Sequence, residues 1–379
     1  MHHSPTTPFN FVERLRHYEP DQPLTDVPAG PGIFILYDEA GHLRRLVTTQ
    51  DLRARASYYF HEREAAESLS VARRAAASMD WLTTRSRFET NYAHFLLFRH
   101  FFPASYQTLY SLPAPYFLCV TEEAYPQLLV TRTLREDARL LIGPFAWRQT
   151  VTEQIDLVNS LLSLRRCDYP IVPHQPYERC LYLQMGSCAA PCDDYAQPAY
   201  MARVDDAVAL LSGDATPVLA AWMAQRDTSS AALNFEEAMR WQGNIQRLET
   251  WLGTRPRFLR GLAALNFVVP QRTKAGLDLF WVREGTLADW ARLADPSTEA
   301  IEAQLAEWHA LPFERPPWPV MRDDLAFITR WLWSREPTPY EFVDDMEEGA
   351  ARLLAHMADE VDELTEEGAV TELPEGEGP

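Results

Sequence analysis

The stretch CLYLQMGSCAAPC, residues 180–192, holds three of the five cysteines of the chain. A fourth precedes it in SLRRC, so that Cys167, Cys180, Cys188 and Cys192 follow the spacing C-x12-C-x7-C-x3-C. Helix-breaking residues interrupt this segment at Pro170, Pro173, Pro176, Gly186 and Pro191. Because proline and glycine prevent a continuous helix, we expect a loop that wraps around something its thiols bind.

Three kinds of chemistry compete for the four thiols. Disulfides are disfavoured, because the chain shows no secretion signal and thiols stay reduced in the cytosol. Structural zinc sites usually contain C-x2-C pairs, and none occurs here. An iron–sulfur cluster is larger than one ion and suits wider, irregular spacing. The spacing favours an iron–sulfur cluster, with zinc and unliganded thiols as the alternatives. Cys119 stands apart in an apolar run and is expected to be a buried small side chain.

The charge of the chain is unevenly distributed. The net charge is −19, but residues 341–379 carry 14 acidic side chains against the single basic Arg352. Residues 1–110 carry 12 basic and 12 acidic side chains, so no block is basic enough for strong attraction to nucleic acid. No apolar run approaches the length of a membrane span. A cytoplasmic protein without a membrane partner is therefore expected.

The hydrophobic patterning indicates an α+β fold. A β-hairpin is predicted over residues 32–49, three strands between 115 and 145, and a second hairpin over 267–285. Helices are predicted over residues 49–79, 87–102, 150–167, 199–213, 297–311 and 322–335, with a helix pair over 216–253. Six tryptophans after residue 256 follow helical and strand spacing and are expected in the core, with a platform for stacking bases as the alternative.

Two long stretches resemble one protein family. VTEEAYPQLLVTRTLREDARLLIGPFAWRQTVTEQIDLVNSLLSLRRC and ERCLYLQMGSCAAPCDDYAQPAYMARVDDAVALLSGD are similar to the segment that follows the N-terminal nuclease domain in the excinuclease subunit UvrC family. The resemblance runs from about residue 30 to about residue 250. It implies a role in nucleotide excision repair, and a [4Fe-4S] cluster held by Cys167, Cys180, Cys188 and Cys192.

The resemblance also implies a GIY-YIG nuclease fold near the N-terminus, but with altered chemistry. PGIFILYDEAGHLRRLVTTQDLRARASYYF, residues 31–60, follows the family pattern. Phe34 falls on the first catalytic tyrosine and lacks its hydroxyl, while Arg45 falls on the second. The family arginine is kept as Arg55, and His94 falls on the glutamate that binds the metal.

These replacements predict a domain that no longer cuts DNA. A neutral imidazole is a poor ligand for Mg²⁺, although it could hold Mn²⁺ or Zn²⁺. Glu89 lies five residues before His94, more than one helical turn, and would point elsewhere. No stretch after Gly253 resembles the family's second, RNase H-type nuclease domain. Two alternatives remain: a divergent endonuclease that uses His94 and Arg55 with Mg²⁺ or Mn²⁺, and an adaptor that does not bind DNA.

The helix pair contains a second resemblance. AALNFEEAMRWQGNIQRL, residues 231–248, is similar to the UVR motif, by which family members bind the helicase UvrB. The matching positions are Leu233, Phe235, Glu236, Ala238, Ile245 and Leu248. Gln242 and Gly243 replace a charged pair that would select the partner. Partner binding and packing of the hairpin onto its own protein are both open.

These features predict a succession of regions along the chain. They comprise a loose N-terminal segment over 1–27, a degenerate GIY-YIG domain with a small mixed sheet over 28–110, a UvrC-like linker with the cysteine cluster over 111–215, a UVR-like hairpin over 216–253, a C-terminal α+β or helical domain over 254–340, and an acidic tail over 341–379 that begins as a helix.

Overall fold

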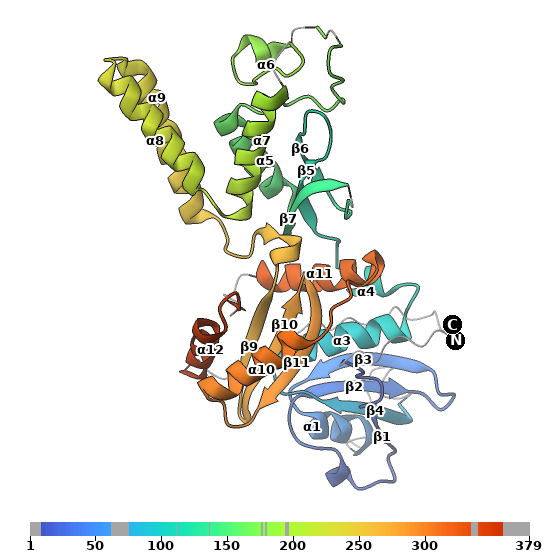
Figure 1. The fold of residues 1–379 in the computed structure, drawn as a ribbon. Coiled ribbons are helices and arrows are strands. Elements are labelled where there is room, and N and C mark those ends of the chain that lie inside the picture. The colour runs from blue at the N-terminus through green and yellow to red at the C-terminus, as the bar shows by residue number, and fades with distance from the viewer. Residues whose placement is uncertain are drawn as a thin grey trace.

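A computed structural model describes residues 9–61, 76–110, 112–135, 137–175, 177–178, 180–193, 197–334 and 340–358. The fold is α+β, as predicted, with small antiparallel sheets and helices packed against them (Figure 1). Within these residues, no helix is both long and apolar enough to cross a membrane. The remainder of the predicted acidic tail, residues 359–379, lies outside the described residues.

The N-terminal sheet has the strand order β1-β4-β2-β3. Its strands are β1 Arg16–Tyr18, β2 Gly32–Tyr37, β3 Leu43–Thr49 and β4 Ser78–Thr83. β2 and β3 form the predicted hairpin, in which Phe34 pairs with Val47. Each pairing in the sheet is antiparallel, whereas we expected a mixed sheet.

The two faces of this sheet are covered by different helices. α1 Leu52–Ala56 continues into the π-helical turn Ser57–His61 and packs on the face that holds Phe34 and Leu36. α3 Arg87–Phe101 covers the opposite face, which holds Ile33 and Ile35. Because successive strand residues point to opposite faces, one apolar run supplies both cores. In Figure 1, α3 and α1 accordingly lie on opposite sides of β2 and β3.

Two expectations for this region need correction. The segment before residue 28 is not loose throughout, because β1 pairs with β4, and Phe9 and Phe11 are buried. The helix expected over residues 49–79 ends before β4, which takes Ser78 and Met79 into the sheet. Residues 62–75 of that expected helix lie outside the described residues. Helical spacing misled us because the alanine-rich pattern runs on into a strand.

The middle region contains a second sheet, of order β6-β5-β7-β8. Its strands are β5 Tyr116–Thr121, β6 Leu128–Thr131, β7 Ala138–Phe145 and β8 Arg260–Gly261, the first three as predicted. Its helices are α5 Arg148–Leu162, α6 Leu181–Gln184 and α7 Gln197–Ser212, while α4 Tyr106–Tyr110 precedes the sheet. Cys119 is fully buried in β5, as expected.

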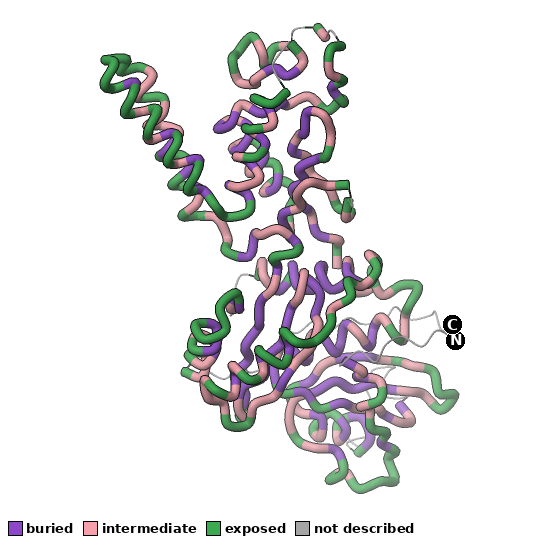
Figure 2. The backbone as a smooth tube through the Cα atoms, viewed as in Figure 1, coloured by how far each residue is buried: buried purple, intermediate pink, exposed green. Residues whose placement is uncertain are grey.

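The helix pair is confirmed as α8 Thr216–Ala231 and α9 Phe235–Thr254. The two helices pack side by side and project from the rest of the molecule at the upper left of Figure 1. Figure 2 shows that their outer end is largely exposed, whereas buried residues gather at the end nearest the body.

The C-terminal region forms a third sheet, of order β11-β10-β9-β12. Its strands are β9 Phe267–Thr273, β10 Gly276–Arg283, β11 Thr286–Leu293 and β12 Glu341–Phe342. Its helices are α10 Thr298–Ala310, α11 Trp318–Leu332 and α12 Met346–Ala355, with short 3-10 turns at Leu262–Ala264 and His356–Ala358. A further 3-10 turn, Leu24–Asp26, lies between β1 and β2 of the N-terminal sheet. The predicted hairpin is β9–β10, and the sequence patterning missed β11. α12 matches the helix expected at the start of the acidic tail.

The C-terminal region packs directly against α3. The ring of Phe88 on α3 lies 4.7 Å from that of Phe280 on β10 and 4.9 Å from that of Trp331 on α11. Tyr92 Oη donates to Asp324 on α11 over 3.0 Å. α3 therefore lies between the first sheet and the C-terminal layer, and one apolar core runs through both.

The six tryptophans of the C-terminal region pack in two apolar cores, Trp281 and Trp308 in one that includes α10 and the other four in or against the core shared with α3. Trp281, Trp308 and Trp331 are buried, while Trp290, Trp318 and Trp333 are partly buried. This arrangement agrees with the core interpretation rather than with an exposed stacking platform.

Candidate metal centre and nuclease-like site

The four clustered cysteines converge in the loop between α5 and α7. α5 stops at Ser163, which adopts a left-handed conformation with φ 52°, so the helix expected to reach Cys167 ends earlier. The backbone N–H of Ala189 donates to Ser163 O over 2.7 Å and fastens the loop to the end of α5. Cys180 precedes α6, and Cys188 lies beyond its end. The loop therefore folds back and carries all four cysteines between the two helices.

The thiols lie within electrostatic reach of one another. Burial raises the pKa of Cys188, and the charges of Cys167, Cys180 and Cys192 raise this pKa further. Burial, followed by the charges of Cys167 and Cys180, likewise raises the pKa of Cys192. The backbone N–H of Ala190 donates to Cys188 Sγ over 3.2 Å. Such a donor favours a sulfur that carries negative charge.

This donor set fits a group bound by four thiolates. Soft thiolate ligands favour zinc or an iron–sulfur cluster over hard cations. In the part of the chain that the structure describes, no three His, Cys, Asp or Glu side chains are arranged to hold a metal ion. The four thiols are thus gathered in one loop, but they do not surround a single-ion position.

Arg165, which the sequence analysis did not single out, lies beside this loop. Its side chain is fully buried, and its Nη1 lies 3.7 Å from Cys167 Sγ. The sequence shows two adjacent arginines, Arg165 and Arg166, and nothing in the pattern says which one is buried. The turn after α5 determines that Arg165 is buried and that Arg166 is partly exposed.

Two of the residues that the sequence analysis aligned with nuclease positions make contacts within the protein. Phe34 is buried, and its ring lies 5.8 Å from that of Tyr59. Arg45 Nη1 donates to Tyr59 Oη over 3.3 Å, so the residue in the place of the second tyrosine serves a contact within the protein. Arg55 on α1 is exposed, and its guanidinium has no hydrogen-bond or ion-pair partner among the described residues.

His94 lies on the other side of the sheet from Arg55. It is 2% exposed on α3, with its ring against those of Phe98 and Tyr110. Its Nε2 lies 3.2 Å from Leu46 O. Because a carbonyl oxygen only accepts, Nε2 must carry a proton and cannot bind a metal. Burial lowers the pKa of His94 to about 4, so the ring is neutral.

Glu89 is also committed to the fold. It is buried, and its carboxylate pairs with Arg14 over 3.1 Å and with Arg292 of β11 over 3.0 Å. It also accepts from the backbone N–H of Arg85 over 2.8 Å. This carboxylate joins the N-terminal segment, α3 and the C-terminal sheet, and is not free to bind a catalytic metal.

The UVR-like positions divide into two groups. Ile245 and Leu248 are buried at the base of the hairpin, and Ala238 is half-buried. Leu233 and Phe235 are exposed at its tip, together with Glu236. The sequence analysis missed Met239, which is 75% exposed one turn beyond Phe235. The base therefore packs on its own protein, and the tip presents an apolar surface.

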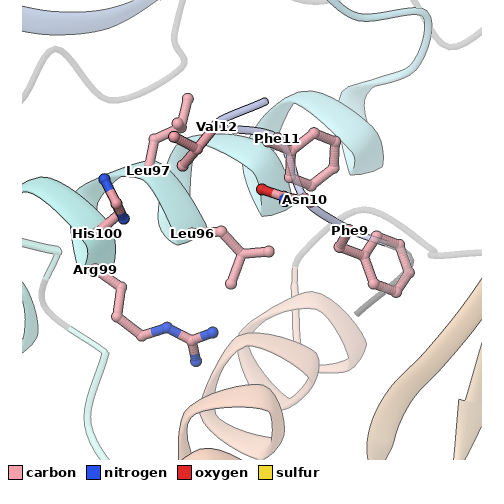
Figure 3. Close-up of a pocket in the computed structure, with 8 residues that line it drawn as sticks. All are labelled: Phe9, Asn10, Phe11, Val12, Leu96, Leu97, Arg99 and His100. Carbon is pink, nitrogen blue, oxygen red and sulfur yellow. The ribbon is translucent and has the colours of Figure 1, made fainter. Parts of the chain in front are cut away.

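A cavity of about 230 Å³ lies between the N-terminal segment and α3, away from these sites (Figure 3). Its lining comprises Phe9, Asn10, Phe11, Val12, Leu96, Leu97, Arg99 and His100. None of the site residues predicted from the sequence lines it. Arg99 pairs with Asp323 over 3.8 Å, which ties this wall to α11.

Comparison with known proteins agrees with the cysteine loop and the sheet that carries it. Residues 115–210 match the family described as UvrC/Cho excinuclease, middle domain. The middle of the chain is thus a domain of the UvrC/Cho class. Beyond this domain, the chain is similar to UvrABC system protein C over up to 76% of its length.

The individual relatives are distant and longer. The UvrABC system protein C of Nitratidesulfovibrio vulgaris is 27% identical over 294 residues, covering 76% of this chain and 42% of the relative. That of Pasteurella multocida is 29% identical over 231 residues, covering 59% of this chain and 37% of the relative. The chain thus spans about two fifths of the length of these curated relatives. No solved structure matches the chain.

Proposed function

We propose that this chain is a non-catalytic UvrC-like protein that acts in nucleotide excision repair. It binds DNA weakly through Arg55, carries a [4Fe-4S] cluster on its four clustered cysteines, and docks on a UvrB-like helicase through its hairpin. The burial of His94 against Leu46 O is the observation that carries the non-catalytic part.

The positions of the nuclease-like residues support this proposal. Metal-assisted hydrolysis needs an open ligand site beside the groups that stabilise the developing charge. His94 is buried on α3, while Arg55 is exposed on α1 across the sheet. Arg55 retains only the ability to pair with a phosphate, which is a single and therefore weak, salt-sensitive contact.

The cysteine loop supports a structural or electron-carrying role for the cluster. When bound, the cluster would link four points of the chain and could carry an electron. Cys167, Cys180, Cys188 and Cys192 would hold it, and the Ala190 N–H would donate to one of its sulfur ligands. Zinc is less well supported by the spacing, because structural zinc sites usually contain C-x2-C pairs and none occurs here.

The hairpin tip supports a protein partner. Phe235 and Met239 are four residues apart on α9, so they lie on one face of the helix. Gln242, which replaces a family charge, accepts from Arg226 of α8 over 3.0 Å and serves the hairpin itself. The apolar tip, rather than the altered charged pair, is the surface that remains for a helical partner.

The first test measures both DNA cleavage and DNA binding by the same protein samples. Cluster-loaded protein would be incubated with damaged and branched DNA, with Mg²⁺ or Mn²⁺, with and without UvrB. We expect no cleavage, and an affinity for DNA that falls with salt. Arg55→Ala should weaken binding and reduce the salt slope by about one.

The matched control is Arg44→Ala, because Arg44 is also exposed on this domain but already pairs with Asp38. Cleavage by the wild-type chain that Arg55→Ala abolishes would contradict the non-catalytic proposal. A wild-type chain that shows no salt-dependent binding to DNA would instead indicate the adaptor without DNA binding.

A further inference from the structure

Arg165 is buried in a place where a charged side chain needs a partner. Its side chain is 0% exposed, between the end of α5 and the cysteine loop. Its backbone N–H donates to Tyr200 Oη over 3.2 Å, and Tyr200 Oη donates to Pro126 O over 2.8 Å. The backbone at Arg165 is therefore fixed to α7 and to the β5–β6 connection.

The guanidinium reaches three different segments. Nη1 donates to Tyr169 O over 2.5 Å and faces Cys167 Sγ at 3.7 Å. Nη2 lies 2.7 Å from Glu123 Oε1, without the alignment of a hydrogen bond. Glu123 Oε1 also accepts from Thr121 Oγ1 over 2.6 Å, so this carboxylate is shared.

These contacts leave the charge incompletely satisfied. Nε of Arg165 is buried and has no hydrogen-bond acceptor among the described residues. A buried ion is costly unless its charge is matched and its donors are used. Glu123 supplies one negative charge and shares it with Thr121, and the thiol that Arg165 contacts directly is Cys167, which receives Nη1.

We propose that Arg165 is a positioning residue for the cysteine-bound cluster, and that it raises the reduction potential of the cluster. The inference rests on the proposed [4Fe-4S] group. A cluster bound by four thiolates carries a net negative charge. One-electron reduction adds one further negative charge, and no proton or ligand has to move. A buried guanidinium that donates to a cysteine sulfur stabilises the reduced form more than the oxidised form.

The chain supplies a matched control in the next residue. Arg166 is partly exposed, with its guanidinium over the ring of Tyr182 and 3.5 Å from Asp156. Arg165→Gln, Arg165→Lys, Arg166→Gln and Arg166→Lys would be prepared in the full chain under anaerobic conditions. Iron and sulfide per chain, visible absorbance and the midpoint potential would be measured, with dithionite as the reductant and redox mediators present.

We expect Arg165→Gln to shift the potential in the negative direction. A tenfold loss in the ratio of reduced to oxidised cluster at a fixed potential corresponds to about 59 mV for a one-electron couple. Arg165→Lys keeps the charge but cannot bond Tyr169 O and Cys167 Sγ as a fork, so an intermediate shift is expected. The two Arg166 variants should match the wild-type potential.

Several outcomes would decide the matter. Variants of Arg165 that load the same iron as the wild type with an unchanged potential would overturn the inference. If Arg165→Gln fails to fold, the midpoint potential of Arg165→Lys is compared with that of Arg166→Lys at equal iron loading. Equal potentials would overturn the inference. A wild-type chain that binds no iron would instead refute the proposed cluster, and with it the basis of this inference. Wild-type loading with an unchanged Arg165→Lys potential would leave the cluster intact and refute only the role of Arg165.

Discussion

His94 occupies the position where resemblance to a GIY-YIG nuclease would put a metal-binding glutamate, and here it is part of the core. Its Nε2 donates to Leu46 O, and aromatic rings of α3 and α4 cover its ring. Burial lowers its pKa to about 4, against about 6.5 in an unfolded chain. The residue therefore stabilises the fold in its neutral form.

A pH dependence of stability follows from this shift. Because the folded pKa is depressed, the contribution of His94 is fully present above about pH 6.5 and is lost as the pH falls toward 4. At pH 5 the loss should be about 2 kcal/mol. His94→Gln can still donate to Leu46 O and should remove this part of the pH dependence. Urea unfolding at pH 7.5 and pH 5 would measure it.

His100, exposed nearly two turns further along α3, provides the control. His100→Gln should leave the difference between the two pH values as in the wild type. A wild-type stability difference that His94→Gln does not reduce would show that His94 is already accessible to protons in the folded state. That result would also reopen His94 as a candidate ligand.

At the scale of elements, the sequence predicts helices and strands well where the apolar residues follow a single helical or strand spacing. The alternating residues of β2 and β3, the long apolar face of α3 and the helix pair were all predicted within a few residues. β4 was missed because an alanine-rich helical pattern runs into it. α5 ends early at Ser163 in a left-handed conformation, for which the sequence offers no glycine as a signal.

The candidate site was predictable only in part, for a related reason. Cysteine spacing and family motifs are local, so the four thiols could be named before the fold was known. The burial of Arg165, His94 and Glu89 depends on segments far apart in the chain. Glu89, for example, pairs with Arg292 from the C-terminal sheet. No local pattern reveals such partners.

The hairpin α8–α9 gives an element-scale prediction. Leu248 at its base is fully buried, whereas Met239 at its tip is exposed. Leu248→Ala should lower the free energy of unfolding by about 2–5 kcal/mol, because it leaves a cavity in the core. Met239→Gln should change stability by less than about 0.5 kcal/mol, yet weaken binding to UvrB.

Urea denaturation and calorimetric titration with UvrB would separate these two effects. Ala224→Gln, at an exposed position of α8, would serve as a surface control for both measurements. Binding that Met239→Gln leaves unchanged, while Leu248→Ala abolishes it only by unfolding the hairpin, would argue against the tip as the docking surface.

At the scale of the whole molecule, α3 joins the N-terminal sheet to the C-terminal layer. Phe88 packs on Phe280 and Trp331, and Phe88 N donates to Gln271 Oε1 over 3.3 Å. Glu89 adds an ion pair from α3 to Arg292. Residues of α3, β9, β10 and α11 therefore share one apolar core, and the region after residue 254 covers the face of α3 that the N-terminal sheet leaves open.

This continuity predicts cooperative unfolding of the two regions. Phe280→Ala should cost about 3–5 kcal/mol, and the loss should appear in the hydrogen exchange of α3 and β2 as well as β10. Lys274→Ala, in the turn between β9 and β10, provides a local control that should leave exchange in α3 unchanged. If Phe280→Ala accelerated exchange in β10 alone, the C-terminal layer would be a separate folding unit. Shared acceleration would mean that the N-terminal sheet, α3 and the C-terminal layer unfold as one cooperative unit, as expected from the apolar core that they share.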